Sequence, residues 1–118
     1  MASQGEERQK QRTAELLRGT LDVLLLKALS RGSMHGYAIA RWIEEATGET
    51  LFIEEGSLYP ALHRLERRAL IEAEWGISEN NRQAKFYKLT AEGRRFLRVE
   101  TKEWLAFATL VRNVLEPT

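Results

Sequence analysis

The chain has 118 residues, no cysteine and a formal net charge of +1, with 43% of its residues hydrophobic and 30% charged. This length predicts one small domain, and the composition is that of a folded globular protein. The lack of cysteine excludes disulfides, thiolate metal sites, iron–sulfur clusters and thiol catalysis. The small net charge, taken alone, argues against a protein that is basic over its whole surface and coats nucleic acid.

The charges are nevertheless segregated along the chain. Residues 56–70 carry three arginines against one glutamate, and residues 80–95 carry five basic side chains against one glutamate, whereas residues 41–55 and 71–79 are acidic. No apolar run approaches the roughly 20 residues of a membrane-spanning helix. The first twelve residues lack the apolar stretch of a signal peptide. We therefore expect a cytoplasmic protein with no membrane partner.

Apolar periodicity predicts two helices in the first half of the chain. Residues 1–14 are polar without periodicity and are expected to form a flexible arm, and a first helix is predicted over residues 15–30. A second helix is predicted over residues 35–47, ended by Gly48. Its expected buried side comprises Tyr37 or Ala38, then Ile39, Trp42, Ile43 and Ala46. Tyr37 is interpreted mainly as a packing residue against the next helix, with a phosphate contact through its hydroxyl as the alternative.

A third helix is predicted over residues 57–68, with Ser57 as N-cap and Pro60 in the first turn. At 100° per residue, one narrow stripe contains the apolar side chains Leu58, Leu62, Leu65 and Ala69. The opposite side contains Ser57, Pro60, His63, Arg64 and Arg67, with Tyr59 on the flank. An ordinary amphipathic helix with a polar outer side explains this pattern as well as a DNA-reading helix does.

A β-hairpin and a long helix complete the predicted chain. Alternation of apolar and acidic residues predicts a strand at Ile71–Trp75, and a second strand is predicted at Phe86–Leu89, with a polar tip at Ser78–Gln83. Thr90 is expected to cap a helix over residues 91–115. The predicted fold class is mainly α with a small β hairpin: a winged helix-turn-helix over residues 15–90 and a C-terminal dimerisation helix over residues 91–118. Such modules place the third helix in the DNA major groove.

Two surfaces follow from this arrangement. The wing, residues 76–88, carries Arg82 and Lys85, which are well placed for phosphates and favour DNA binding over a merely polar surface. The final helix is apolar at nine of the twelve positions of residues 104–115, more than one buried stripe requires. A second copy of the chain is the expected cover. The predicted interface residues are Leu97, Trp104, Leu105, Ala108, Val111 and Leu115.

Enzymatic chemistry has little support in the sequence. His35 and His63 lack partners at metal-ligand spacing, and Ser57 and His63 lie on different sides of their helix. No glycine-rich loop for phosphates occurs. We expect no enzyme, no metal and no cofactor. The alternative to a DNA-binding function is a winged helix that serves as an interaction module for an acidic protein.

The string GSLYPALHRLERRALIEAEW, with MHGYAIARWI before it and KFYKLTAEGRRFL after it, resembles the PadR family of bacterial transcriptional regulators. The resemblance covers residues 17–104 and implies a dimeric repressor that binds an inverted-repeat operator in double-stranded DNA and responds to a small effector. Relatives often have glycine at the position of Ala69. The resemblance makes the following residues candidates for DNA contacts: Ser57, Tyr59, Pro60, His63, Arg64, Arg82 and Lys85.

The same resemblance bears on the final helix. Some relatives bind flat aromatic effectors between subunits with a tryptophan of this helix. Trp104 and Phe107 are therefore candidate effector residues, and packing of Trp104 in the dimer interface is the alternative interpretation.

Overall fold

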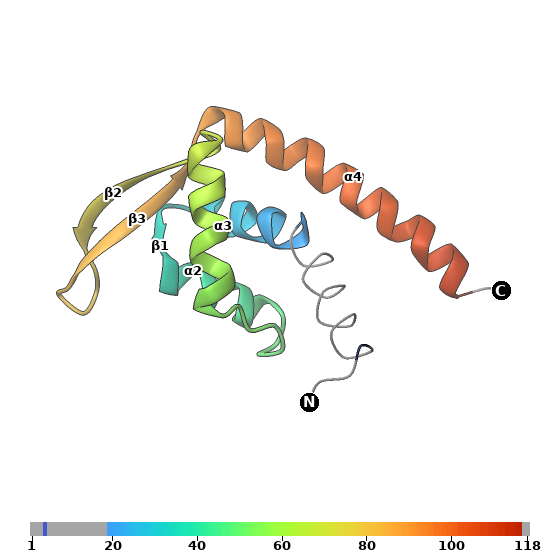
Figure 1. The fold of residues 1–118 in the computed structure, drawn as a ribbon, viewed down its shortest axis with the longest axis horizontal. Coiled ribbons are helices and arrows are strands. Elements are labelled where there is room, and N and C mark those ends of the chain that lie inside the picture. The colour runs from blue at the N-terminus through green and yellow to red at the C-terminus, as the bar shows by residue number, and fades with distance from the viewer. Residues whose placement is uncertain (1–3, 5–18, 117–118) are drawn as a thin grey trace.

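The computed structural model describes Gln4 and residues 19–116. The predicted N-terminal arm, Gln4 apart, and the predicted start of the first helix lie outside the described residues. The elements are a helical segment over residues 19–29, β1 (Met34–His35), α2 (Gly36–Ala46), α3 (Glu55–Arg67), β2 (Ile71–Ile77), β3 (Gln83–Leu89) and α4 (Ala91–Leu115). Figure 1 shows the hairpin projecting on one side and α4 extending away on the other. The predicted class, mainly α with a long C-terminal helix, is confirmed.

The sheet has three antiparallel strands in the order β1-β3-β2. The hairpin register pairs Ile71 with Leu89 and Trp75 with Lys85, and its strands run two to three residues beyond the predicted ends. β1 pairs Met34 with Tyr87. The sequence did not predict β1, because two residues are too few to show an alternating pattern.

The core lies between the helices and the inner face of the sheet. The largest fully buried side chains are Leu25, Leu26, Leu29, Ile39, Ile43, Leu62, Leu65 and Ile71. The predicted stripe of α3 is confirmed at Leu58, Leu62 and Leu65 and is wrong at Ala69, which is exposed with φ 60° in the turn after the helix. In that turn the Leu70 N–H donates to the Leu65 carbonyl over 3.0 Å. Leu70, not Ala69, therefore enters the core.

The start of α3 differs from the prediction. Its N-cap is Glu54, which makes no side-chain cap bond, so Ser57 is the third helical residue and not the cap. Pro60 consequently lies within the helix and not in its first turn, and it cannot donate to the carbonyl of Gly56 four residues earlier. Gly56 is exposed, so water can hydrate that carbonyl.

α2 corrects the prediction near both of its ends. Ile39 and Ile43 are buried as expected, and Ala38, the alternative to Tyr37, is half-buried, but Tyr37 is 73% exposed and Ala46 is exposed. The helix begins one residue after the predicted position because His35 is its cap: the His35 Nδ1 atom accepts a hydrogen bond from the Ala38 N–H over 3.2 Å. The aromatic side chain that joins α2 to α3 is not Tyr37.

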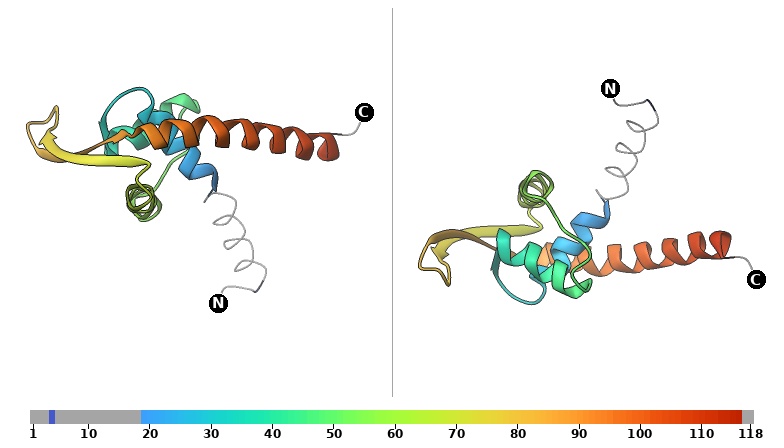
Figure 2. Two further views of the ribbon diagram at one scale, coloured as in Figure 1. Left: turned by 90° about the horizontal axis from the view of Figure 1, so that it is seen from above. Right: turned by 90° about the horizontal axis from the view of Figure 1, so that it is seen from below.

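The predicted cap and bounds of α4 are confirmed. The Thr90 Oγ1 atom accepts from the Gly93 N–H over 3.0 Å and donates to the Ala69 carbonyl over 2.7 Å. Gly93 packs so closely that a Cβ there would lie 2.0 Å from the Leu70 carbonyl oxygen. The helix start is thus fixed against the turn between α3 and β2. Beyond it α4 runs free of the sheet (Figure 2). No helix within the described part of the chain is long and apolar enough to cross a membrane.

Candidate nucleic-acid interface

The outer side of α3 is the first component of the candidate interface. Ser57, Pro60, His63 and Arg67 are all exposed there, opposite the buried leucines. Arginine, serine and histidine can hydrogen-bond to base edges or phosphates, and a proline ring can pack on a thymine methyl. The structure therefore brings together on one surface the side chains that the helical angles predicted to share it.

Tyr59 is held at the edge of this surface by the start of α2. A Cβ at Gly36 would lie 2.8 Å from the Tyr59 hydroxyl oxygen, so only glycine allows the ring to approach this closely. Tyr59 remains 38% exposed despite this packing. The packing role expected of Tyr37 thus belongs to Tyr59, and Tyr37 is left pointing to solvent, where it can contact a ligand.

Arg64 lies on the flank of α3 that faces the N-terminal helical segment. Its Nη2 atom lies 3.0 Å from the Asp22 Oδ1 atom, and both side chains are partly exposed. This ion pair could not be predicted from local sequence patterns, since 42 residues separate its members. The Arg64 guanidinium keeps further donors for another ligand, because one hydrogen bond uses only one of its five N–H groups.

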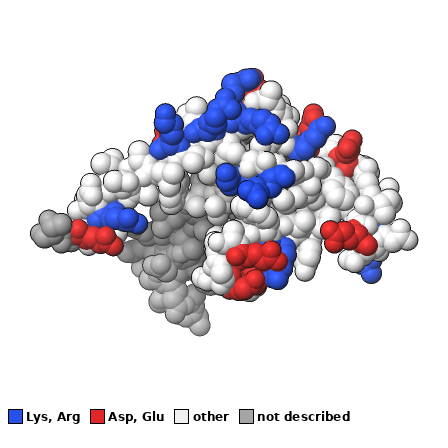
Figure 3. All heavy atoms as spheres, turned by 180° about the vertical axis from the view of Figure 1, so that it is seen from behind, with Lys and Arg blue, Asp and Glu red and all other residues white. Residues whose placement is uncertain are grey.

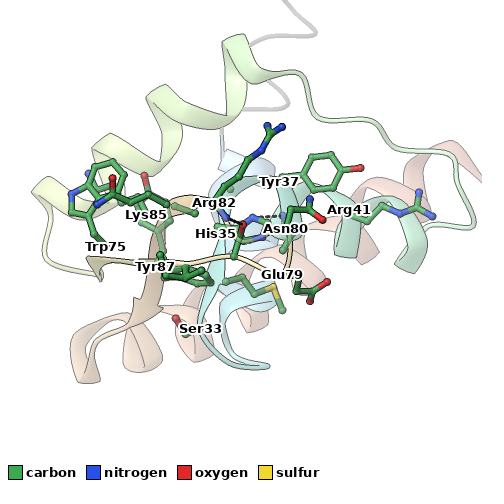
Figure 4. Close-up of a pocket in the computed structure, with 18 of the residues that line it drawn as sticks. Ser33, His35, Tyr37, Arg41, Trp75, Glu79, Asn80, Arg82, Lys85 and Tyr87 are labelled. Carbon is green, nitrogen blue, oxygen red and sulfur yellow. Dashed lines mark hydrogen bonds between the residues drawn. The ribbon is translucent and has the colours of Figure 1, made fainter.

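The wing adds basic and aromatic side chains beside α3. The Lys85 Nζ atom lies 3.3 Å from the Glu66 Oε1 atom of α3, and Arg82 stands on the turn that closes the hairpin. Figure 4 shows the open hollow, of about 920 Å³, that lies between the wing, β1 and the start of α2. Trp75 and Lys85 are neighbours across the strands, and Tyr37 lines the same hollow.

Trp75 is a residue whose exposure the sequence analysis missed. Its alternation with acidic neighbours predicted a half-buried position, yet its side chain is 66% exposed, as is Ile77. Alternation reports which face of a strand a residue occupies and does not report where the core ends. Both residues share the inner face of the hairpin with Ile71, but they lie further along β2 toward the hairpin tip, and Figure 1 shows that this end of the hairpin projects away from the helices.

The acidic segment of residues 41–55, which begins in α2 and continues into the link to α3, neutralises its own arginine. Arg41 forms ion pairs with Glu44, Glu45 and Glu49 at 2.9–3.0 Å. The hydrogen bonds that Arg41 donates to Glu44 and Glu49, with the attraction of the Glu49 charge, raise the pKa of Arg41 above its ordinary value. Figure 3 shows that charges of opposite sign are also separated on the face opposite that of Figure 1. The largest group of basic side chains lies along the upper edge of this face, and the acidic side chains lie in separate groups.

A second, apolar site lies where α4 passes the N-terminal helical segment. The Trp104 Nε1 atom donates to the Thr20 Oγ1 atom over 3.1 Å, and the two elements enclose a groove of about 590 Å³. Its apolar lining includes Val23, Leu24, Leu97, Trp104 and Leu105. Phe107, the second predicted effector residue, is 64% exposed and does not line this groove.

The predicted dimer residues of α4 fall into two groups. Leu97 is only 8% exposed because it belongs to the core of its own chain, so it has little surface to offer a partner. Leu105 and Leu115 are more than half exposed, Val111 is 38% exposed, and Ala108 is intermediate. Phe107, Leu110 and Val114, which were not predicted as interface residues, are exposed as well.

No group of three or more histidine, aspartate or glutamate side chains that could hold a metal occurs among the described residues. The groups assembled on the surface are hydrogen-bond donors, cations and aromatic rings. They suit recognition of a ligand more than bond-breaking chemistry.

Comparison with known proteins agrees with this architecture. The sequence profile of the Transcriptional regulator PadR-like family matches residues 25–99. A solved structure of a PadR family transcriptional regulator from Eggerthella lenta is 32% identical, with a TM-score of 0.74 over 99% of this chain and 100% of that chain. A transcriptional regulator from Clostridium thermocellum is 29% identical, with a TM-score of 0.76 over 84% of this chain and 96% of that chain. An uncharacterized protein of Lysinibacillus sphaericus is 29% identical over 103 residues, which are 87% of this chain and 94% of the relative.

Three helices, a wing and a long C-terminal helix define a winged-helix transcriptional regulator. More narrowly, the chain belongs to the PadR family of transcriptional regulators. The family match agrees with the resemblance inferred from the sequence. The matched family consists of regulators and not enzymes.

Proposed function

We propose that the protein is a dimeric repressor that binds an inverted-repeat operator in double-stranded DNA and is released by a small aromatic effector. The observation that carries this proposal is the common surface of α3 and the wing. There Pro60, His63 and Arg67 are exposed next to a hairpin that bears Arg82 and Lys85. An α-helix with such side chains fits the major groove, and the wing cations are placed for the flanking phosphates.

Two-fold symmetry is the second part of the proposal. A chain of this size reads only a short half-site, and a dimer reads two half-sites one helical turn, about 34–36 Å, apart. The exposed apolar side chains of α4 supply a surface for a second copy. Contiguous apolar surface of this kind is typical of interaction sites.

The experiment that tests the proposal is selection of bound duplexes from a random pool. A palindromic consensus is the expected result, and a collection of unrelated sequences would contradict it. Affinity for the selected operator should fall with salt at a log–log slope of about −0.9 per phosphate contact. If the protein serves instead as an interaction module for an acidic protein, no duplex will be enriched.

Two substitutions divide base reading from phosphate binding. Arg64→Ala is expected to weaken operator binding by roughly 1–3 kcal/mol and to relax the preference at one base pair. Lys85→Ala is expected to weaken binding to the operator and to its single-base variants alike, and to reduce the salt slope on them by about 1. Unchanged operator binding by both variants would contradict this assignment of the contacts.

The effector part rests on the groove beside Trp104. A flat aromatic compound can stack on the indole ring and bury its apolar surface against Val23 and Leu24. We expect candidate aromatic compounds to quench tryptophan fluorescence of the wild type more than that of Trp104→Phe. Trp104→Phe retains only Trp42 and Trp75 as fluorescent tryptophans. Equal quenching in the two proteins would therefore mean that the compound acts on those two side chains, which would contradict a site at Trp104.

A further inference from the structure

The cations proposed to contact DNA are not equivalent in the free protein. Arg64 and Lys85 each have a carboxylate at ion-pair distance, Asp22 at 3.0 Å and Glu66 at 3.3 Å. Within residues 19–116, no carboxylate lies within 4.0 Å of Arg67 or Arg82. The same surface therefore carries two cations that are already neutralised and two that are not.

These two ion pairs are exposed enough to be broken without a change of fold. The side chains of Arg64 and Lys85 are 35% and 32% exposed, so DNA can reach both without unfolding any element. Partly exposed ion pairs contribute little to stability, because water screens the attraction and holding two long side chains together costs entropy. A phosphate or a guanine edge can therefore replace the carboxylate as the partner of either cation.

We infer that Asp22 and Glu66 are specificity-determining residues that hold Arg64 and Lys85 back from non-operator DNA. This inference rests on the proposed function. A neutralised pair gives a phosphate no net charge to attract, so loose binding anywhere on a duplex uses only the cations without a carboxylate partner. On the operator, the base contacts of α3 bring both cations into position, and each exchanges its carboxylate for DNA. The carboxylates thus reduce non-specific binding more than operator binding.

The test compares salt dependence on two duplexes, the selected operator and an unrelated sequence of equal length, for Asp22→Asn and Glu66→Gln. Each substitution keeps the shape of the side chain and removes its charge. On the unrelated duplex we expect each variant to steepen the log–log slope by about 0.9, which is about a 3.5-fold greater loss of affinity between 50 and 200 mM salt. On the operator we expect the wild-type slope, since both cations are already engaged there.

A matched control is provided by Glu72→Gln. Glu72 pairs with Lys88 at the same 3.3 Å as the Glu66–Lys85 pair, but on the opposite face of the hairpin. Glu72→Gln removes one negative charge, as Glu66→Gln does, but it removes it from β2 and frees no cation beside α3. We expect it to leave the slope on both duplexes unchanged.

Three results would overturn the inference: unchanged slopes on the unrelated duplex for both variants, an equal steepening in Glu72→Gln, or a loss of operator affinity in Asp22→Asn and Glu66→Gln. Thermal unfolding of each variant checks that it is folded, and the two pairs are separate, so a poorly folded variant leaves the other as the test. Failure of the proposed function is a different result: the selection would then enrich no duplex, and the wild type would bind no sequence better than an unrelated one.

Discussion

The helices α3 and α4 differ in where their apolar side chains find a partner. In α3, Leu58, Leu62 and Leu65 are at most 2% exposed, all covered by the chain itself. In the second half of α4, Leu105, Leu110 and Val114 are more than half exposed. Burial of one such side chain stabilises by about 1.5–3 kcal/mol. The stability of α3 is therefore a property of the single chain, whereas the apolar surface of α4 is useful only when another surface covers it.

The outward faces of the two helices also differ in polarity. The outer side of α3 is polar and basic, which suits the edges of bases and phosphates, and the outer side of α4 is apolar, which suits a second protein surface. One small chain thus combines a helix whose apolar side is covered within the chain, α3, with a helix whose second half exposes its apolar side chains, α4. Four experiments test this difference between α3 and α4, and the first should give the largest change.

The strongest test places a charge on the apolar side of α4. In Val111→Asp the dimer would bury two carboxylates, one per subunit, and we expect the dimer to weaken by on the order of 4–6 kcal/mol. Sedimentation at a series of protein concentrations measures the shift to monomer. Asn113→Asp, two residues further on and on the opposite side of the helix, adds the same charge and should leave the dimer intact. Equal effects of the two changes would contradict the proposed interface.

Leu65→Ala tests the opposite region. Leu65 is fully buried in α3, so its truncation should lower the free energy of unfolding by about 2–5 kcal/mol. Because the partners of Leu65 belong to the same chain, the loss should be the same at low and high protein concentration in urea unfolding. His63→Ala, on the exposed side of the same helix, should change stability by less than about 0.5 kcal/mol. A loss that varies with protein concentration would contradict an autonomous winged-helix core.

Ala69→Gly is expected to stabilise the winged-helix domain, because Ala69 lies in the turn between α3 and β2. Ala69 has φ 60°, a left-handed conformation that costs a residue with a Cβ roughly 1–2 kcal/mol and costs glycine much less. After the greater chain entropy of glycine in the unfolded state is included, we expect a gain of about 1 kcal/mol in urea unfolding. Ala46→Gly, at a helical position in α2, should instead lower stability. A lower midpoint for Ala69→Gly would show that the turn is not strained.

The smallest change should be in how the stability of the fold depends on pH. Burial raises the pKa of Tyr87, which is 3% exposed on the inner face of β3. The unfolded chain ionises this tyrosine near pH 10 while the folded chain keeps it neutral, so its contribution is complete below about pH 10 and is lost as the pH rises through the folded-state pKa. Urea midpoints between pH 8 and 11 should fall less for Tyr87→Phe than for the wild type. Tyr37→Phe, at an exposed position, should follow the wild type.

Much of the fold could be predicted because it depends on local patterns. The bounds of α4 and its Thr90 cap follow from a capping residue before a long periodic segment, and the leucine stripe of α3 follows from helical spacing. The outer residues of α3 could be named for the same reason. The cap of α3 was misassigned, because Ser57 is a good capping residue in isolation and only the packed structure shows that the helix already begins at Glu55.

Contacts between distant segments could not be predicted. The closeness of Gly36 and Tyr59, the pairing of Arg64 with Asp22, and the exposure of Trp75 depend on how the elements are arranged in space. Segment charges located the basic side chains, but they did not reveal which of them are neutralised by a carboxylate.

The order of the helices and the hairpin, the family, and the two segments where positive charge gathers could thus be predicted from the sequence, because each of these is a property of neighbouring residues or of a recognisable motif. The packing of the elements was needed to show which cations of residues 19–116 lack a carboxylate partner, which aromatic side chain joins α2 to α3, and where the core ends along the wing. Those features arise from side chains that lie 19 to 42 residues apart in the chain, as Asp22 and Arg64 do at the upper end, and local periodicity contains no information about them.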